Sequence, residues 1–395
     1  MKKLFLRLIF IGLIFSCDEK GSEEIYQGKL QELIVGDFSL EKDSLTKYIF
    51  NIRVVEDNSQ EYISFTKPAN IRKEWVFALI STISGKEAGR IEIPTEGPES
   101  MRGGIHANIV VSENQVFQIN HLGEIGEYNG EGKKIALYNF FSDYKAKLNG
   151  KGGEFPLNFE ITQFNPSIIQ LGNNPSKFLN TKKPVAAGEM MTEFPLDFKN
   201  WITHVDLETG EVENSDFSMP EGYEVFKNDN TASVLFGAYD SKRDLYYLAW
   251  PYSDEVYVLN GVKMESVVKP FSSVEFNYFP SERKAMDLNT VLLQPKNASK
   301  QLFLLYDEQR DLIIRCSKIE ESGASESTFE RTKHYVLSIN SGEWESKGEY
   351  FFDFETEIEV ENWFLTSEGL FINKPEQESE DEYEFYKIDL SGFEK

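Results

Sequence analysis

Residues 201–210 read Trp-Ile-Thr-His-Val-Asp-Leu-Glu-Thr-Gly, an apolar run that is followed at once by a tight turn. The run Trp201 to Leu207 is rich in aromatic and β-branched residues, which fit a pleated, half-buried surface. The glycine of the turn Thr209-Gly210 supplies the positive φ that two-residue hairpin turns require. We therefore predict a β-hairpin at this point of the chain.

The same pattern, a strand-like run with a glycine turn and a second run, occurs six times. The turns are Ser84-Gly85, Asn129-Gly130, Thr209-Gly210, Asn260-Gly261, Ser341-Gly342 and Ser391-Gly392. Successive glycines of these turns are 45, 80, 51, 81 and 50 residues apart. Three spacings match a four-stranded propeller blade, which takes roughly 40–50 residues. The two long spacings need insertions, for which residues 141–200 and 319–333 leave room.

Apolar periodicity of helix length is almost absent, so the chain is predicted to be all-β. We predict a six-bladed β-propeller with four-stranded antiparallel blades, six blades being favoured over seven. The chain ends just after Ser391-Gly392, which leaves the last blade without an outermost strand. A strand around Leu30 to Phe38 is expected to pair with the last hairpin and close the ring. The rival fold is a pair of β-sandwiches, which does not require hairpins spread evenly over the chain.

The N-terminus has the pattern of a bacterial lipoprotein signal. Basic residues accompany an apolar run from Leu8 to Phe15, and Ser16 stands directly before Cys17. The run is too short to span a bilayer, which takes about 20 residues. We therefore predict cleavage before Cys17, with lipid such as palmitate attached to that cysteine.

This assignment divides the chain into three parts. Residues 1–16 are predicted to be a signal peptide, 17–24 the lipidated cysteine with a flexible tether, and 25–395 a single propeller domain. Acidic residues directly after the cysteine resemble the surface-export signal of Bacteroidota lipoproteins, and a solvated linker explains them equally well. We expect the protein in the cell envelope, lipid-anchored in the outer membrane and facing the periplasm or the surface.

The composition is strongly acidic, with 66 Asp and Glu against 41 Lys and Arg and a formal net charge of −25. Such a surface repels phosphate backbones, so nucleic acid is not expected as a partner. Membrane attachment must then come from the lipid. Once Cys17 carries lipid, Cys316 stands alone, so no intramolecular disulfide is expected. Cys316 lies in an apolar run and is predicted to be a buried strand thiol.

Several short segments resemble a family of Bacteroidota lipoproteins. They are the loop Glu96-Gly97-Pro98-Glu99-Ser100 after the run Arg90 to Pro94, and the late hairpins at residues 204–210 and 386–392. With the lipidated start and the length, they are similar to the family named domain of unknown function 4221. The resemblance covers essentially the mature chain and rests on structural turns. It implies a TolB-like six-bladed propeller in the envelope and supplies no catalytic residues.

Motifs that carry chemistry are scarce. The sequence contains no Gly-x-Ser-x-Gly elbow and no Gly-x-Gly-x-x-Gly loop before a helix. The four histidines lack the spacing of a metal site, so we predict neither metal nor cofactor. Asn228-Asp229-Asn230 and the acidic run Glu376 to Glu384 carry oxygens that suit calcium, and we interpret both as solvated loops.

A propeller supplies one face where ligands usually bind, formed by the links between blades and the loops between second and third strands. The residues expected near that face are Glu99, Arg102, His106, His121, Trp250 and Tyr252. Aromatic rings beside charged groups suit a peptide or a sugar. The competing interpretation is structural: Trp250 caps the core and Arg102 pairs with an acid.

The function predicted from these features is a non-enzymatic, lipid-anchored binding module for a protein, peptide or glycan. The alternative is a carbohydrate-acting hydrolase or lyase that uses the central channel, which fold analogy alone supports. A third possibility is a purely structural envelope component. Two carboxyl groups, or an arginine with a histidine, facing one deep channel favour the enzyme.

Overall fold

The structure is a computed structural model. It describes residues 25–43, 45–46, 49–57, 60–67, 74–103, 105–120, 124–139, 158–161, 177–185, 201–215, 217–286, 289–293, 295–321, 333–354 and 363–393. The predicted signal peptide, Cys17 and the tether lie outside these residues. The described part consists of β-strands and short 3-10 helices without an α-helix, so the all-β prediction is confirmed. None of its helices has the length and apolar character needed to cross a bilayer.

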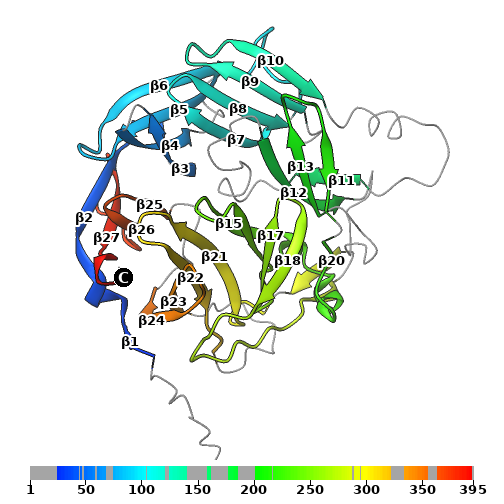
Figure 1. Cartoon of the computed structure of the whole chain (residues 1–395), viewed down its shortest axis with the longest axis vertical. Helices are drawn as coiled ribbons and strands as arrows, with labels where there is room; N and C mark the ends of the chain where they lie inside the picture. Colours follow the sequence, from blue (N-terminus) through cyan, green and yellow to red (C-terminus); the bar gives the residue numbers. More distant parts are fainter. Residues whose placement is uncertain are drawn as a thin grey trace, which may run out of the picture.

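The strands of the first half form three antiparallel sheets in chain order (Figure 1). The first sheet contains β3 (Phe50–Asp57), β4 (Gln60–Lys67), β5 (Glu74–Ser81) and β6 (Glu87–Pro94). The second contains β7 (Ile105–Ser112), β8 (Gln115–Asn120), β9 (Glu124–Asn129) and β10 (Lys134–Asn139). The third contains β11 (Asn158–Ile161), β12 (Lys177–Val185), β13 (Ile202–Asp206) and β14 (Val212–Asn214).

The second half continues the series and takes up two N-terminal strands. One sheet contains β15 (Phe236–Asp240), β16 (Leu245–Ala249), β17 (Val256–Asn260) and β18 (Lys263–Val268). A five-stranded sheet contains β21 (Lys300–Asp307), β22 (Leu312–Lys318), β23 (His334–Ser341), β24 (Ser346–Asp353) and, parallel to β24, β1 (Gln27–Lys29). The last contains β25 (Phe364–Thr366), β26 (Gly369–Asn373), β27 (Glu382–Ile388) and β2 (Ile34–Glu41). A two-stranded hairpin, β19 (Glu282–Met286) with β20 (Asn289–Leu293), is inserted after β18. The 3-10 helices are η1 (Leu30–Leu33), η3 (Tyr223–Phe226), η4 (Asn230–Ser233) and η6 (Ser391–Phe393).

The sheets stand radially around a common centre, which is the arrangement of a β-propeller (Figure 1). Five of them are four-stranded antiparallel blades. The prediction of a β-propeller with four-stranded antiparallel blades is therefore confirmed for five blades. The sheets do not form the pair of β-sandwiches that was considered as the rival fold.

The expected pairing of an early strand with the last hairpin is present. Strand β2 pairs antiparallel with β27, with Phe38 opposite Phe385. The strand begins later than predicted, because residues Leu30–Leu33 form η1 and the Leu30 side chain packs into the core beside β22 to β24. Phe364, Phe371 and Phe385 of this last sheet share a core cluster with Phe65 of the first. Apolar packing thus joins the two ends of the chain.

The glycine turns were predicted well in place and less well in detail. Five of the six join the third and fourth strands of a blade or of the five-stranded sheet, and Gly85, Gly210 and Gly261 have positive φ. In the β9–β10 turn the positive φ is at Gly132. In the β23–β24 turn it is at Trp344. The sixth prediction was wrong, since β27 ends at Ile388 and the following turn leads into η6 instead of a second strand among the described residues.

Cys316 lies on β22 and is fully buried in the core cluster that joins β21–β24 to β25–β27. Burial raises the pKa of its thiol well above the ordinary value. The prediction of a buried, unreactive strand cysteine is confirmed.

Candidate functional site

The strand order gives the propeller two different faces. The links between successive sheets and the loops between second and third strands lie on one face, which we call the link face. The turns between first and second and between third and fourth strands lie on the opposite face, which we call the turn face. This follows because successive antiparallel strands reverse direction within each sheet. Tyr252 lies on the link face, in the loop between β16 and β17.

Around Tyr252 the link face carries an aromatic and acidic group that we call the tyrosine cluster. It comprises Phe226, Asp229, Tyr252, Asp254 and Tyr278. The ring centroids of Phe226 and Tyr252 are 4.8 Å apart, and those of Tyr252 and Tyr278 are 6.2 Å apart. Both tyrosines are only partly buried. A partly exposed aromatic pair beside carboxylates suits contact with a sugar or a peptide.

Asp229 fixes the position of Tyr252. The Asp229 carboxylate is 1% exposed, and its Oδ1 accepts hydrogen bonds from the backbone N and the hydroxyl of Thr231, both at 2.8 Å. Its Oδ2 accepts from the Tyr252 hydroxyl at 2.7 Å and from the Ser281 hydroxyl at 3.2 Å. Asp229 is also the N-cap of η4. The phenol is thus held by a carboxylate that the fold itself anchors.

Asp254 holds the second tyrosine in a similar way. The Tyr278 hydroxyl donates to Oδ1 of Asp254 at 2.5 Å and accepts from Nε2 of Gln301 at 2.7 Å. Nζ of Lys269 lies 3.3 Å from the other carboxylate oxygen. Burial, followed by the charge of Asp254, raises the pKa of Tyr278 far above its ordinary value. The Tyr278 phenol therefore stays protonated at neutral pH and acts as a hydrogen-bonding group.

Trp250 lies below this surface rather than on it. Its side chain is fully buried. It packs edge-on against Trp201 at 5.0 Å and stacks on Phe217 at 5.8 Å. In this position the indole supports the loop that carries Tyr252, as the structural interpretation expected, and it offers no surface to a ligand.

The other predicted site residues lie on the link between β6 and β7 or beyond the described part. Oε2 of Glu99 accepts a hydrogen bond from the backbone N of Lys134 at 2.6 Å, which ties the link to β10. Arg102 is exposed and its carbonyl oxygen accepts from Nδ2 of Asn120 at 2.9 Å. His106 belongs to β7, but its side chain is not described, and His121 lies outside the described residues. Glu99 and Arg102 thus lie on the link between β6 and β7, whereas Tyr252 lies in the loop between β16 and β17 of a different sheet.

Asp229 and Tyr278 were not predicted as site residues. Asp229 was considered only as an oxygen donor for calcium, and in the structure hydroxyl and amide donors occupy its carboxylate. No group of three or more His, Cys, Asp or Glu side chains suited to a metal occurs among the described residues. Both residues lie in irregular links without strand periodicity, so no pattern in the sequence pointed to them.

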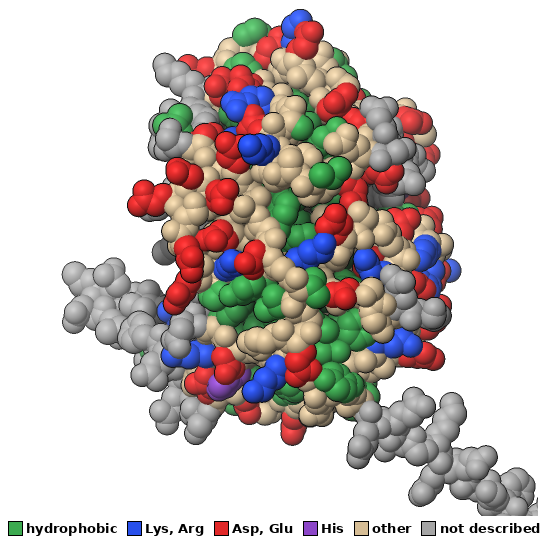
Figure 2. Space-filling view, turned by 90° about the vertical axis from the view of Figure 1, so that its left-hand side faces the viewer, with side chains coloured by type: hydrophobic (Ala, Val, Ile, Leu, Met, Phe, Trp, Pro, Cys, Tyr) green, Lys and Arg blue, Asp and Glu red, His purple; other side chains and the backbone are tan. Residues whose placement is uncertain are grey.

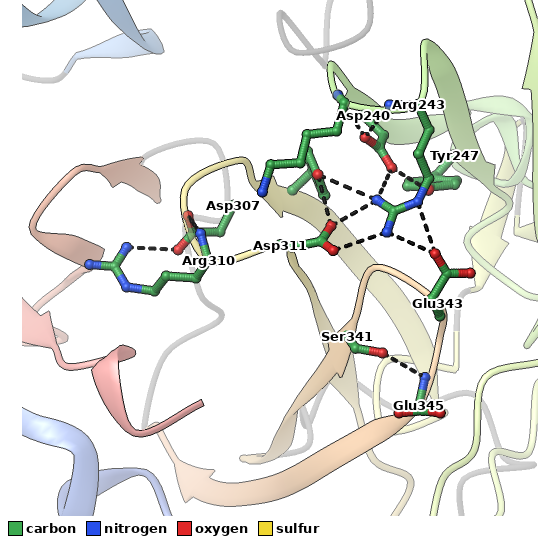
Figure 3. Close-up of polar contacts among 11 residues, drawn as sticks. Asp240, Arg243, Tyr247, Asp307, Arg310, Asp311, Ser341, Glu343 and Glu345 are labelled. Carbon is green, nitrogen blue, oxygen red and sulfur yellow. Dashed lines mark hydrogen bonds and ion pairs between the residues drawn. The ribbon is translucent and has the colours of Figure 1, made fainter. Parts of the chain in front are cut away.

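The turn face carries a different arrangement, an arginine clamp between neighbouring sheets (Figure 3). Arg243, in the β15–β16 turn, donates to Asp240 at 2.8 Å. It also binds both carboxylate oxygens of Asp311, at 2.7 and 3.0 Å, and Oε1 of Glu343 at 2.9 Å. Asp311 and Glu343 belong to the next sheet, so one guanidinium joins two sheets. Two bonds to one carboxylate make this contact strong as well as directional.

A sequence repeat underlies the clamp. Tyr-Asp-x-x-Arg-Asp-Leu occurs at residues 239–245 and again at 306–312. In both copies the second Asp has positive φ, 57° at Asp244 and 55° at Asp311. In the second copy Arg310 donates to Asp307 at 2.9 Å and to the Ser367 carbonyl of the following sheet at 2.8 Å. This repeat was a detectable signal for the contacts between sheets.

The outer surface seen from the left of Figure 1 carries acidic side chains over its whole height, with basic ones between them (Figure 2). Charge of this kind agrees with the net charge of −25 in the sequence.

One comparison with a solved structure bears on the fold. No protein-family model and no curated protein matches the chain. A solved structure of a member of the domain of unknown function 4221 family from Bacteroides vulgatus is similar, with a TM-score of 0.66 and 16% identity over 90% of this chain and 97% of that chain. Two others are a luciferin-regenerating enzyme (8% identity, 90% and 96% coverage, TM-score 0.46) and a protein of unknown function from Bacteroides thetaiotaomicron (13%, 92% and 75%, TM-score 0.42). The last two are too distant to support an argument. The first shows that this chain shares the fold of the Bacteroides vulgatus protein.

Proposed function

We propose that this chain is a lipid-anchored β-propeller of the cell envelope that binds a peptide, protein or glycan at its link face. The tyrosine cluster carries this proposal, because carboxylates that the fold anchors hold a partly exposed pair of tyrosines in place. Side chains fixed in advance lose little entropy when a ligand binds. Hydrogen-bonded phenols beside aromatic rings match the alternating polar and apolar surfaces of sugars and peptides.

We also propose that the propeller has a sixth blade and that the chain belongs to the domain of unknown function 4221 family. The strands β21–β24 follow the same antiparallel order as the five four-stranded blades, and β1 adds to their outer edge. Counting this sheet as a blade gives six. Similarity to the Bacteroides vulgatus structure over 90% of this chain supports membership of the domain of unknown function 4221 family. We further propose that residues 25–395 form one domain and that the lipid on Cys17 places it at the outer membrane.

Binding is preferred to catalysis because of how the two carboxylates are used. Asp229 receives four hydrogen bonds, and Asp254 is shared between Tyr278 and Lys269. Groups occupied in this way position neighbours more readily than they exchange protons with a substrate. No feature of the described residues favours the hydrolase or lyase alternative more specifically.

The experiment is a screen of the purified protein on glycan and peptide arrays, followed by the double variant Tyr252→Ala/Tyr278→Ala. We expect the double variant to lose at least about tenfold in affinity for any captured ligand. Tyr138→Ala, on the outer strand β10, is the control and should bind like the wild type. Equal binding by the double variant would remove the tyrosine cluster as the site.

The anchor is tested separately. Cys17→Ala should abolish incorporation of radiolabelled palmitate and leave an unprocessed or soluble protein. Label that still enters the variant would show that the lipid assignment is wrong.

A further inference from the structure

Arg315 is a buried cation that none of the contacts above explains. It lies on β22, opposite Leu304 of β21 and Ser338 of β23. Only 2% of the Arg315 residue is exposed to solvent. Ile313, two residues earlier on the same side of the strand, packs against β15–β17. The guanidinium therefore lies between the β15–β18 and β21–β24 sheets, and its contact with the Asp254 carbonyl places it beside the β16–β17 loop of the link face.

The contacts of Arg315 are few for a buried arginine. Nη1 donates to the carbonyl oxygen of Asp254 at a long 3.4 Å, and the Phe276 ring centroid lies 5.8 Å from the guanidinium carbon. Nε and Nη2 have no hydrogen-bond partner among the described residues. No carboxylate of the described chain forms an ion pair with it, whereas Arg243 and Arg310 each have at least one. Buried donors are almost always satisfied, so this exception calls for an acceptor.

Two carboxylates act on Arg315 through space, and both are already occupied. Glu349 is fully buried and accepts hydrogen bonds from the Ser272 hydroxyl at 2.8 Å and the Ser273 backbone N at 3.0 Å. Asp254 is held by Tyr278 and Lys269. Desolvation lowers the pKa of Arg315, and the negative charges of Asp254 and Glu349 oppose that change. These carboxylates partly offset the cost of burying the cation, but they accept no hydrogen bond from Nε or Nη2 of Arg315.

The geometry of the free edge is specific. In a guanidinium, Nε–H and the neighbouring Nη2–H point in parallel, and this pair matches the two oxygens of a carboxylate. The two donors of Arg315 that have no partner among the described residues, Nε and Nη2, form this one edge of the guanidinium. Water fills single donors readily, but the parallel pair is the arrangement by which arginine selects carboxylates over neutral acceptors.

We propose that Arg315 receives the carboxylate of a ligand that enters from the link face beside Tyr278. Asp254 connects the two places, because its carbonyl oxygen contacts Arg315 while its side chain holds Tyr278. The inference rests on the proposed binding function and narrows its ligands to those with a carboxylate, either an acidic sugar or a peptide C-terminus. Phe276 and Tyr278 belong to the same irregular segment between β18 and β19, so this segment links the guanidinium to the tyrosine cluster.

The experiment measures thermal unfolding of the whole purified protein with three matched pairs of probes at constant ionic strength. The pairs are acetate with acetamide, glucuronate with glucose, and N-acetylglycine with N-acetylglycinamide. We expect at least one carboxylate to raise Tm by about 2 °C or more at saturation, with no shift from its neutral partner. A response to glucuronate identifies an acidic sugar, and one to N-acetylglycine identifies a peptide terminus.

Variants locate the effect. Arg315→Met should abolish the shift and, without probe, unfold at the same temperature as the wild type or higher, since it removes an unpaired buried charge. Lys269→Met removes an exposed cation that contacts Asp254 and should keep the full shift. Arg315→Lys keeps the charge without the parallel donors and should bind at least about tenfold more weakly, which tests the idea even if Arg315→Met does not fold.

Three results would overturn the proposal: no difference between carboxylates and neutral partners, an undiminished shift in Arg315→Met, or equal binding by Arg315→Lys. In the first case the edge holds water only. Failure of the tyrosine cluster is a separate result. If Tyr252→Ala/Tyr278→Ala binds array ligands normally while Arg315→Met loses the carboxylate shift, the binding face is elsewhere and Arg315 remains a carboxylate site.

Discussion

Replacing Arg243 with methionine should destabilise the propeller more than any other single charge deletion on the turn face. The guanidinium makes four strong contacts to three carboxylates from two sheets (Figure 3). The side chain of Asp240 is completely buried, that of Asp311 is 21% exposed and that of Glu343 is 67% exposed. Methionine keeps the length of the side chain, so the variant removes the charge and the bonds with little loss of packing.

The magnitude follows from burial. Hydrogen bonds from the Arg243 guanidinium are the main cause that lowers the pKa of Asp311 from 3.8 to about 2, with smaller contributions from Tyr306 and Lys242, and the whole shift corresponds to about 2 kcal/mol. Leaving Asp240 buried without its cation adds to this, and breaking a buried pair costs about 3–5 kcal/mol. The exposed Glu343 adds at most about 1 kcal/mol. Because these three contributions share one guanidinium, they do not add in full, and we expect a loss of at least about 3 kcal/mol in the free energy of unfolding.

Urea unfolding followed by tryptophan fluorescence measures this loss, and pH provides an internal check. Because the folded pKa of Asp311 is lowered, its contribution is complete above the unfolded value of 3.8 and is lost as the pH falls through about 2. The difference between wild type and Arg243→Met should thus be constant from about pH 7 to about pH 5 and shrink below about pH 4. Arg243→Lys should lie between the two proteins, because lysine cannot bind Asp311 with two parallel bonds.

The control is Lys133→Met, which removes an exposed pair with Glu131 at 2.7 Å and should leave stability unchanged within error. A loss below about 1 kcal/mol for Arg243→Met would refute the reasoning, since it would place the clamp among ordinary surface ion pairs. A difference that persists unchanged at about pH 2 would show that Asp311 is not the main partner.

Two further changes test the fold. Gly132→Ala should cost more than about 1 kcal/mol by urea unfolding, because Gly132 has a φ of 72° and an added Cβ would lie 1.8 Å from the Glu92 carbonyl oxygen. Gly36→Ala is its control, with open space and ordinary φ, and should stay within about 1 kcal/mol of the wild type; equal losses would contradict the steric argument. Leu40→Ala should cost about 2–5 kcal/mol, because Leu40 of β2 is fully buried in the cluster that joins the last sheet to the first. If Leu40→Ala lost less free energy of unfolding than Gly36→Ala, the packing of β2 would not be what closes the ring.

The residues that were predicted correctly are those whose structure depends on their immediate neighbours. Gly85, Gly210 and Gly261 were identified because positive φ is a property of one residue, and glycine adopts it without strain. Trp344 takes the same conformation, and no local preference predicts it. Its ring packs edge-on against Tyr247 at 5.1 Å, so a contact with another sheet fixes the turn.

The candidate site shows the same division. The prediction of Tyr252 as a site residue rests on its position after a strand in a loop with charged neighbours, whereas Trp250, two residues earlier, is buried. Burial depends on Trp201 and Phe217, which come from elsewhere in the chain. Asp229 and Tyr278 were missed because they meet Tyr252 only after two links fold over the end of the β15–β18 sheet.

The amino-acid sequence alone determined the all-β class, the positions of most third-to-fourth-strand turns and the burial of Cys316, because alternation of apolar residues and the conformation of glycine are local properties. The tertiary structure decided which polar groups meet. Arg243 pairs with Asp311 across a boundary between sheets, and Arg315 has no ion-pair partner among the described residues although it is buried on β22. Contacts between residues far apart in the chain depend on how the sheets pack, and no short stretch of sequence contains that information.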